Sequence, residues 1–442
     1  MKKTTLRSLA FGLVTMWAIV SEAQTIEQNM NMLFTLADQH NTSIRSYQTA
    51  LEKAQQTVEA ARAQRLPDVT TALSVSYIGT GQILNRDLSY NMNPNFPHWG
   101  NSFALEAQQV VYAGGALSGG IRMAELGKTM ERHHDEGNRE SVHMLLAGLY
   151  LQRQSLLNRL AVVEKNVMLA DTLIDKTRNR YDEGVVLRND ITRYELMREQ
   201  MALQKVVIAD RIKIVDKQMQ TALYGHDTHA QTALQEATDM DASIQSLPLH
   251  DEAYWQELAL TENSNLKKAT TSIELSKVKE KLTRAASLPQ VAITAADNLS
   301  GPNLINIPAL DKNVNYWYVG VGVKYNISSI YKNKKNIRGA KLATKNAEEQ
   351  RDVAKESISD AVHAAYVGLQ TVRSELKTRE KSRQLARQNY DVISNRYNNG
   401  LALVTDMTDA ANVRLDAELQ YVDAQIAVAL AYYQLKYVAG DI

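Results

Sequence analysis

The strongest constraint on the fold of this chain is an internal repeat. The stretch RYDEGVVLRNDIT at residues 180–192 returns 216 positions later as RYNNGLALVTDMT at 396–408, and six of the thirteen positions are identical. Each copy lies in a long interval without proline, 98–247 or 309–442, which is rich in residues that favour helices. A duplication of this size predicts a fold made of two similar halves.

The proline-free intervals predict long helices. Apolar residues recur about every 3.5 positions from Leu156 to Ile174 and again from Leu415 to Tyr433, which is coiled-coil spacing. A helix over residues 116–181 would be about 100 Å long, at a rise of 1.5 Å per residue. Such a helix cannot fold back into a compact globule, so we expect it to lie beside other helices.

The prolines mark segments of a different kind. Leu66-Pro67 and Leu288-Pro289 are each followed by an alternating apolar and polar stretch, a loop, and a second alternating stretch. This alternation is typical of a strand with one apolar face, and we expect β-hairpins over 68–112 and 290–327. Strands of about ten residues suit the wall of a transmembrane barrel. A surface hairpin on a soluble protein would show the same alternation.

Aromatic residues crowd the ends of the expected strands. In membrane barrels such residues form girdles at the two interfaces with water. Their presence here favours the membrane barrel over the surface hairpin. The candidate girdle residues are Trp99, Phe103, Tyr316, Trp317 and Tyr318.

The N-terminus has the pattern of a secretory signal peptide. Residues 1–23 begin with the positive Lys2, Lys3 and Arg7, continue with an apolar core, and end at the small-x-small site Ser21-Glu22-Ala23. The chain has no cysteine, so after export it would be stabilised by packing without disulfides. Its formal net charge of +1 and its lack of clustered basic residues give no indication of nucleic-acid binding.

These features predict an order of parts along the chain. A signal peptide at 1–23 precedes a first repeat at 24–225, a linker at 226–249 and a second repeat at 250–442. Each repeat is expected to contain a helix, a β-hairpin, a long helix, a turn and a further helix. The two turns are expected at 181–190 and 397–406.

Taken together, the signal peptide, the two Leu-Pro hairpin units and the two helices ending in Arg-Tyr-x-x-Gly resemble the TolC-type outer-membrane efflux proteins. The resemblance covers residues 24–442. It implies a mixed α/β, mostly α-helical membrane protein that forms a homotrimer. Each protomer would give four strands to one 12-stranded transmembrane β-barrel in the outer-membrane lipid. The barrel would continue into a long periplasmic α-helical coiled-coil barrel.

The same resemblance implies a function and partners. The protein would be an outer-membrane channel-tunnel with a gate at its periplasmic tip, and it would need no cofactor. An inner-membrane pump and a periplasmic adaptor protein would deliver small molecules or polypeptides to it. The alternative function is a soluble periplasmic coiled-coil scaffold, which membrane fractionation would distinguish from a channel.

The resemblance also assigns roles to residues of the turns. Asp406 and Asp409 match aspartates that ring the closed entrance. Tyr397 matches a tyrosine that ties the tip to the neighbouring hairpin, and Asp190 matches the carboxylate partner of that tyrosine. The family's arginine two residues after the glycine is replaced here by Ala402. Either this contact at the tip is weaker here, or another residue, Arg396 or Arg188, supplies it.

The residues themselves allow a simpler interpretation of the aspartates. Gly184 and Gly400 can adopt the positive φ that closes a helix, and Asp190 and Asp406 would then cap the next helix at its N-terminus. The spacing of Asp406 and Asp409 also places them on one helix face. The threefold symmetry that the resemblance implies would gather six such carboxylates around an opening. The candidate residues for the helix-tip turns and adaptor docking are Arg180, Tyr181, Gly184, Arg396 and Gly400.

No catalytic or metal site is predicted. ALSGG at 116–120 lacks the first glycine of a nucleophile elbow. His133-His134 and the pair His226 and His229 have no accompanying ligands at metal-site spacing. We therefore expect no enzymatic activity.

Overall fold

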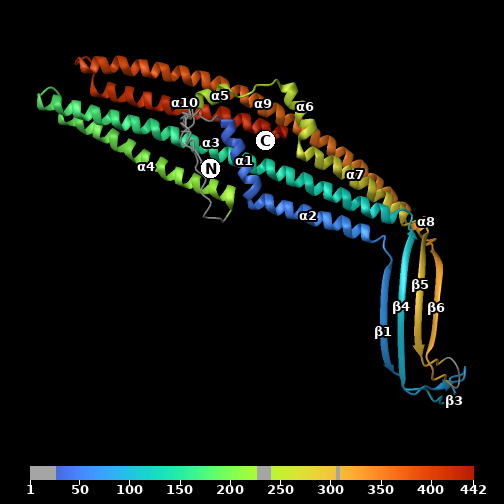
Figure 1. Ribbon diagram of the computed structural model, residues 1–442. Helices are drawn as coiled ribbons and strands as arrows, with labels where there is room; N and C mark the ends of the chain where they lie inside the picture. The colour runs from blue at the N-terminus through green and yellow to red at the C-terminus, as the bar shows by residue number, and fades with distance from the viewer. Residues whose placement is uncertain (1–25, 226–239, 305–308) are drawn as a thin grey trace, which may run out of the picture. The chain divides into compact units, whose positions relative to one another are not determined.

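The computed structural model describes residues 26–225, 240–304 and 309–442 (Figure 1). The predicted signal peptide, most of the predicted linker, and His226 and His229 lie outside these residues. The helices are α1 (Ile26–His40), α2 (Thr42–Ala63), α3 (Ala116–Asp182), α4 (Arg188–Tyr224), α5 (Met240–Gln245), α6 (Glu252–Glu262), α7 (Ser264–Ala285), α8 (Ser329–Lys332), α9 (Lys334–Asn398) and α10 (Val404–Ala439). The strands are β1 (Asp68–Tyr77), β2 (Ile83–Leu84), β3 (Tyr90–Met92), β4 (Trp99–Tyr112), β5 (Gln290–Gly301) and β6 (Val314–Lys324).

The fold is mixed and mostly α-helical, as the sequence predicts. Its two longest helices, α3 with 67 residues and α9 with 65, occupy corresponding places in the two sequence repeats. At a rise of 1.5 Å per residue each is about 100 Å long. None of the helices in the described ranges combines the length and apolarity needed to cross a membrane.

The chain folds into two compact units that do not coincide with the sequence repeats. The first contains Met1–Ala37, of which the structure describes Ile26 onward, together with Leu145–Leu249 and Gln370–Tyr432. The second contains Asp38–Met144, His250–Leu369 and Tyr433–Ile442. Each unit draws on both repeats because α3 and α9 each contribute residues to both units.

The second unit contains an antiparallel sheet in the order β1-β4-β5-β6 (Figure 1). β1 pairs with β4, and β5 pairs with β6, within their respective repeats. The central pairing joins the repeats, with Phe103 of β4 opposite Leu299 of β5. β1 and β6 are left as the edges of the sheet.

The two faces of this sheet differ in chemistry. Residues opposite one another in the register share a face, and one set of positions, which we call the apolar face, is largely aliphatic and aromatic. The apolar face includes Val69, Leu73, Val75, Tyr77, Trp99, Phe103, Leu105, Leu299, Trp317, Val319, Val321 and Val323. The opposite face contains Thr70, Ser74, Ser102, Glu106, Gln108, Thr294, Asn298, Gly320, Gly322 and Lys324.

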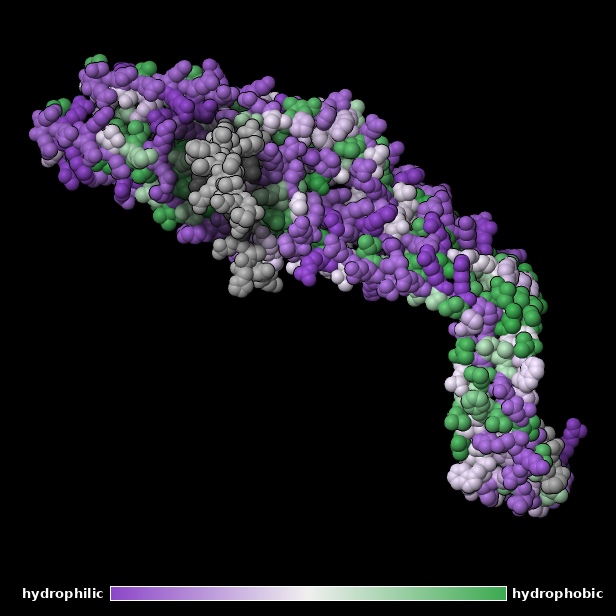
Figure 2. All heavy atoms as spheres, in the orientation of Figure 1, coloured by the Kyte–Doolittle hydropathy of each residue, from purple (hydrophilic) through white to green (hydrophobic). Residues whose placement is uncertain are grey.

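The apolar face is exposed within the single chain. Leu73, Val319 and Val321 are all among the exposed residues. Figure 2 shows hydrophobic residues gathered over the strands, whereas the helices present mainly hydrophilic surface. A contiguous exposed apolar surface marks a contact with another protein or with lipid.

The predicted girdle residues divide between the two faces. Trp99, Phe103 and Trp317 lie on the apolar face, whereas Tyr316 and Tyr318 lie on the opposite, polar face. Adjacent strand residues alternate in direction, so a run of three aromatics cannot contribute all its members to one girdle.

Candidate gate at the paired helical turns

The two repeated stretches form the same turn in the first unit. Gly184 has φ 74° and Gly400 has φ 75°, the positive values expected at a helix C-terminus. The residue after each glycine donates its N–H to the arginine carbonyl four residues before that glycine, from Val185 to Arg180 at 2.9 Å and from Leu401 to Arg396 at 2.8 Å. The predicted role of the glycines in closing the helices is thus confirmed.

The two aspartates after the turns also make equivalent contacts. The carboxylate of Asp190 accepts the N–H of Leu187 at 3.1 Å, and that of Asp406 accepts the N–H of Leu403 at 3.0 Å. Each aspartate therefore satisfies a backbone donor at the start of α4 or α10 and places negative charge at the positive end of the helix dipole. Both residues are helix caps, as the simpler interpretation predicts.

The tyrosines of the two turns have different environments. Tyr397 of the second turn is 5% exposed, whereas its counterpart Tyr181 is 42% exposed. The ring of Tyr397 packs edge-on against Tyr194 of α4, with ring centroids 6.5 Å apart, and its hydroxyl lies 3.5 Å from Oγ1 of Thr177. The second turn is thus anchored to the first hairpin through a buried aromatic pair.

The arginines of the two turns differ in their hydrogen-bond partners. Nη1 of Arg180 donates to the carbonyl of Tyr397 at 3.2 Å, and its guanidinium lies 5.1 Å from the centroid of that ring. Its counterpart Arg396 donates within its own turn, from Nη2 to the carbonyl of Leu401 at 3.4 Å. Arg180 therefore contacts both turns, whereas the contact of Arg396 stays within its own turn.

The expected hydrogen bond between Tyr397 and Asp190 is not formed. Asp190 instead accepts the N–H of Leu187, and the hydroxyl of Tyr397 lies 3.5 Å from Oγ1 of Thr177. Burial, together with the neighbouring hydroxyl of Tyr397, raises the pKa of Tyr194 well above its ordinary value, and the negative charge of Asp190 adds to this effect. Tyr194 therefore stays neutral at physiological pH.

Asp406 and Asp409 are both exposed on α10, and their i, i+3 spacing puts them on one face of the helix. In the described ranges neither carboxylate has an ion-pair partner within 4.0 Å. Ala402 lies in the same turn and contributes no charge. Both carboxylates can therefore interact with a solute or with the same carboxylates of another protomer.

A cavity of about 410 Å³ lies between the two turns. Beside it, each turn exposes two large apolar residues: Val185 and Leu187 in the first, Leu401 and Leu403 in the second. These pairs are separated by the same 216 positions as the repeat. Leu187 is 73% exposed and Leu403 is 70% exposed, so each turn presents a large aliphatic side chain at the matched position.

A buried acidic residue, Glu418 of α10, was missed by the sequence analysis. It is 6% exposed and lies 3.1 Å from Nε of Arg387 and 3.9 Å from Nε of Arg414, with Nδ2 of Asn166 at 3.5 Å. A charge this deeply buried requires such partners. The sequence feature that could have identified it is its position directly before Leu419, within the apolar stripe of α10.

Helix α5 is fastened to α10 by a carboxylate. Oδ1 of Asp241 accepts the hydroxyl of Tyr421 at 2.5 Å and Nε2 of Gln425 at 2.6 Å. Burial, together with the hydrogen bond to Asp241, raises the pKa of Tyr421 to about 12. The tyrosine therefore stays protonated and continues to donate to Asp241 at neutral pH.

This contact predicts an alkaline loss of stability. The unfolded tyrosine has a pKa of 10.0 and the folded one about 12, so the stabilisation is complete below pH 10 and is lost as the pH rises towards 12. In Tyr421→Phe we expect a weaker fall of the unfolding midpoint over that interval than in wild type. The exposed Tyr181→Phe is the control, and equal slopes in Tyr421→Phe and wild type would contradict the prediction.

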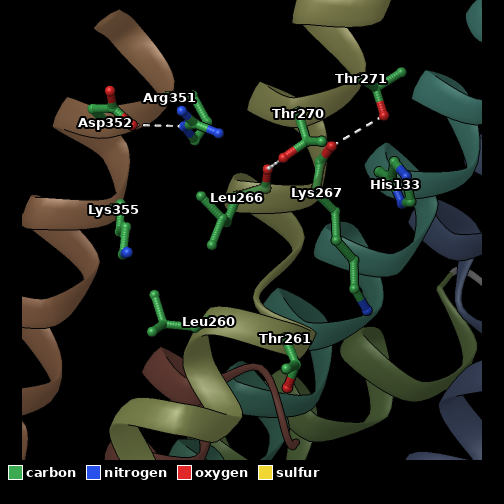
Figure 3. Close-up of a pocket in the computed structure, with 10 residues that line it drawn as sticks. All are labelled: His133, Leu260, Thr261, Leu266, Lys267, Thr270, Thr271, Arg351, Asp352 and Lys355. Carbon is green, nitrogen blue, oxygen red and sulfur yellow. Dashed lines mark hydrogen bonds and ion pairs between the residues drawn. The ribbon is translucent and has the colours of Figure 1, made fainter. Parts of the chain in front are cut away.

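A further cavity, of about 520 Å³, lies in the second unit between α3, α6, α7 and α9 (Figure 3). Most of its charges are paired: Arg351 with Asp352 at 2.7 Å, and Lys267 with Glu262 at 2.8 Å. His133, predicted to be a helix residue without a metal, lies 2.9 Å from Glu136. Across the described ranges no three His, Asp or Glu side chains converge as metal ligands.

The chain combines an antiparallel sheet that has one exposed apolar face with paired helical hairpins that end in matched turns. A sequence model of the family "Outer membrane efflux protein" matches residues 33–195 and 255–441, and the chain belongs to this family. It is an outer-membrane channel-tunnel for export that extends into the periplasm. Proteins of the family work as trimeric channels with adaptor and pump partners and are transporters.

Solved structures of outer-membrane channels have the same fold. The outer membrane protein VceC from Vibrio cholerae is 16% identical, with a TM-score of 0.76 over 93% of this chain and 96% of that one. The CmeC outer membrane channel from Campylobacter jejuni is 15% identical, with a TM-score of 0.71 over 100% and 94%. The open state of MtrE from Neisseria gonorrhoeae is 15% identical, with a TM-score of 0.74 over 93% and 88%. A comparison with curated protein sequences finds no match.

Proposed function

We propose that this chain forms a homotrimeric export duct that is closed at its periplasmic tip by the paired turns. The observation that carries the proposal is the four-stranded sheet, which has an exposed apolar face and two unpaired edges. Unpaired edges are a liability that closure into a barrel removes. Pairing of β1 with β6 of the next copy would close three sheets into one barrel and turn the apolar face towards lipid.

The gate would consist of two parts. Arg180 and the buried Tyr397 would hold the second turn against the first hairpin in each protomer. Asp406 and Asp409 would meet their symmetry copies around the opening and favour cations there. The closed state is then stabilised by contacts within each protomer, while the selectivity arises between protomers.

The tips of the turns would dock a periplasmic adaptor protein. Val185, Leu187, Leu401 and Leu403 offer exposed apolar side chains around the cavity between the turns. Arg180, Tyr181, Gly184, Arg396 and Gly400 supply the turn geometry beneath them. Small molecules or polypeptides loaded by an inner-membrane pump would pass through the open tip. The soluble scaffold alternative gains no support from membership of this family.

Extraction from membranes tests the proposal directly. A barrel in lipid requires detergent for release, and we expect the expressed chain to remain with the membrane in high salt and to run as a trimer after detergent extraction. Release by salt alone would contradict a transmembrane sheet and would favour the soluble periplasmic scaffold instead.

Asp297 provides a sharper test of where the apolar face points. It lies on that face between Leu105 of β4 and Trp317 of β6. If the face meets lipid, Asp297→Leu removes a charge from hydrocarbon, and we expect the trimer in detergent to gain about 1 kcal/mol in unfolding free energy. The matched control is Glu106→Leu on the polar face, for which no gain is expected. A gain in both variants, or in neither, would contradict a lipid-facing apolar face.

A further inference from the structure

A cavity of about 360 Å³ lies in the first unit, between α3, α5, α9 and α10. Its volume falls in the range of small-ligand sites, about 300–1,000 Å³. It shares no lining residue with the cavity between the two turns. The proposed gate therefore leaves this cavity without a role.

The lining of this cavity holds more positive than negative side chains. Its cations are Lys165, Arg383 and Arg387, and its acids are Asp241 and Glu418. Both carboxylates are already engaged. Asp241 accepts from Tyr421 and Gln425, and Glu418 pairs with Arg387.

Two of the three cations lack an acidic partner. The guanidinium of Arg383 lies against Tyr421, 3.6 Å from the ring centroid, and a ring face provides no hydrogen-bond acceptor of the strength of an oxygen for its N–H groups. Nε of Arg383 is buried and has no acceptor among the described residues. Lys165 on α3 lines the same cavity and makes no ion pair within the described ranges.

Nε of Arg383 is covered by protein, so a ligand in the cavity would be held by the terminal guanidinium nitrogens, which have no acidic partner in the described ranges. Oxyanions are the natural partner, because the planar fork of arginine matches the paired oxygens of a carboxylate or phosphate. In the cavity of Figure 3 the only arginine of the lining, Arg351, is paired with Asp352. Its Lys267 is paired with Glu262, and Lys355 alone has no ion pair in the described ranges. Of these two cavities, the one in the first unit therefore combines ligand-sized space with two cations, Arg383 and Lys165, that have no ion pair in the described ranges.

We propose that this cavity binds a small oxyanion, a phosphate or a carboxylate, between Arg383 of α9 and Lys165 of α3. The ligand would bridge two helices that come from different sequence repeats. It would lie next to the contact between Asp241 and Tyr421 that fastens α5. Binding would consequently stabilise the packing of α5, α9 and α10 around it.

The test is a titration of the full-length detergent-extracted protein with inorganic phosphate and, separately, with citrate at constant ionic strength. The thermal unfolding midpoint is followed in wild type, Lys165→Gln, Arg383→Lys and Arg383→Gln. Lys165 is exposed, so Lys165→Gln should fold normally. Lys176→Gln, an exposed lysine on the same helix outside the cavity, is the matched control.

We expect a saturable rise of the midpoint in wild type and in Lys176→Gln, because a ligand that binds only the folded state stabilises it. Lys165→Gln and Arg383→Gln should weaken the apparent affinity by about tenfold or more, and Arg383→Lys should weaken it less. If phosphate saturates at a lower concentration than citrate, the site prefers phosphate. If citrate does, the site prefers a carboxylate. Phosphate and citrate also stabilise proteins by exclusion from their surfaces, which gives a rise that does not saturate. A rise of that kind, equal in all variants, or no rise at all, would overturn the proposal.

Discussion

Arg180→Ala is expected to hold the purified channel open for a larger fraction of time than wild type. The variant loses the hydrogen bond from the guanidinium to the carbonyl of Tyr397 and the contact with the tyrosine ring. A charged hydrogen bond and a cation–π contact of this kind together contribute about 2 kcal/mol. That loss corresponds to roughly a thirtyfold shift towards the open state in each protomer. Single-channel recording in planar bilayers measures the open fraction.

The repeat supplies a matched control for this prediction. Arg396 occupies the corresponding position of the second turn but donates to Leu401 in its own turn, so Arg396→Ala should leave the open fraction close to wild type. Equal opening by both variants would mean that loss of charge near the tip, and not the contact across the turns, controls the gate. Tyr397→Phe, which removes only a hydroxyl 3.5 Å from Thr177, should open the channel less than Arg180→Ala does.

Replacing Asp406 and Asp409 together by asparagine is expected to abolish most of the cation preference of the channel. Asparagine retains a side-chain oxygen that can accept the N–H of Leu403, so the turn should keep its shape. A tenfold fall in the cation-to-anion permeability ratio requires only about 1.4 kcal/mol of electrostatic energy at the opening. The ratio follows from reversal potentials in a salt gradient, and high salt should reduce the difference from wild type.

The control here is Asp190→Asn in the first turn. Asp190 makes the same capping contact with Leu187 that Asp406 makes with Leu403. If capping alone explains these residues, the first-turn and second-turn variants should behave alike. A preference for cations that survives in Asp406→Asn/Asp409→Asn would move the selective ring elsewhere in the duct.

Much of the fold was predictable because it is encoded in local patterns. The proline-free intervals and the spacing of their apolar residues predict α3, α9 and α10. The alternation after Pro67 and Pro289 predicts the strands, and the positions of glycine and aspartate predict the turns and caps. Each of these signals depends on residues within a few positions of one another. The duplication doubled every signal and so made the order of the parts recognisable.

The pairing of β4 with β5 could not be predicted in the same way. Phe103 and Leu299 lie opposite each other although almost half the chain separates them, and an alternating strand would fit several neighbours equally well. The alternation was nevertheless sufficient to assign Trp317 and Tyr318 to opposite faces. Both were listed as girdle residues because they lie near a strand end, and the register places only Trp317 on the apolar face.

By itself the sequence determined that two equivalent Arg-Tyr-x-x-Gly turns would form, because the geometry of a helix end depends on its own glycine and capping residue. Only the tertiary structure decided that the two turns would differ. Tyr397 is buried against Tyr194 while Tyr181 is exposed, and Arg180 reaches across while Arg396 stays within its turn. The physical reason is that burial and hydrogen-bond partners depend on which helix packs beside a residue, and identical local sequences meet different neighbours once the long helices are assembled.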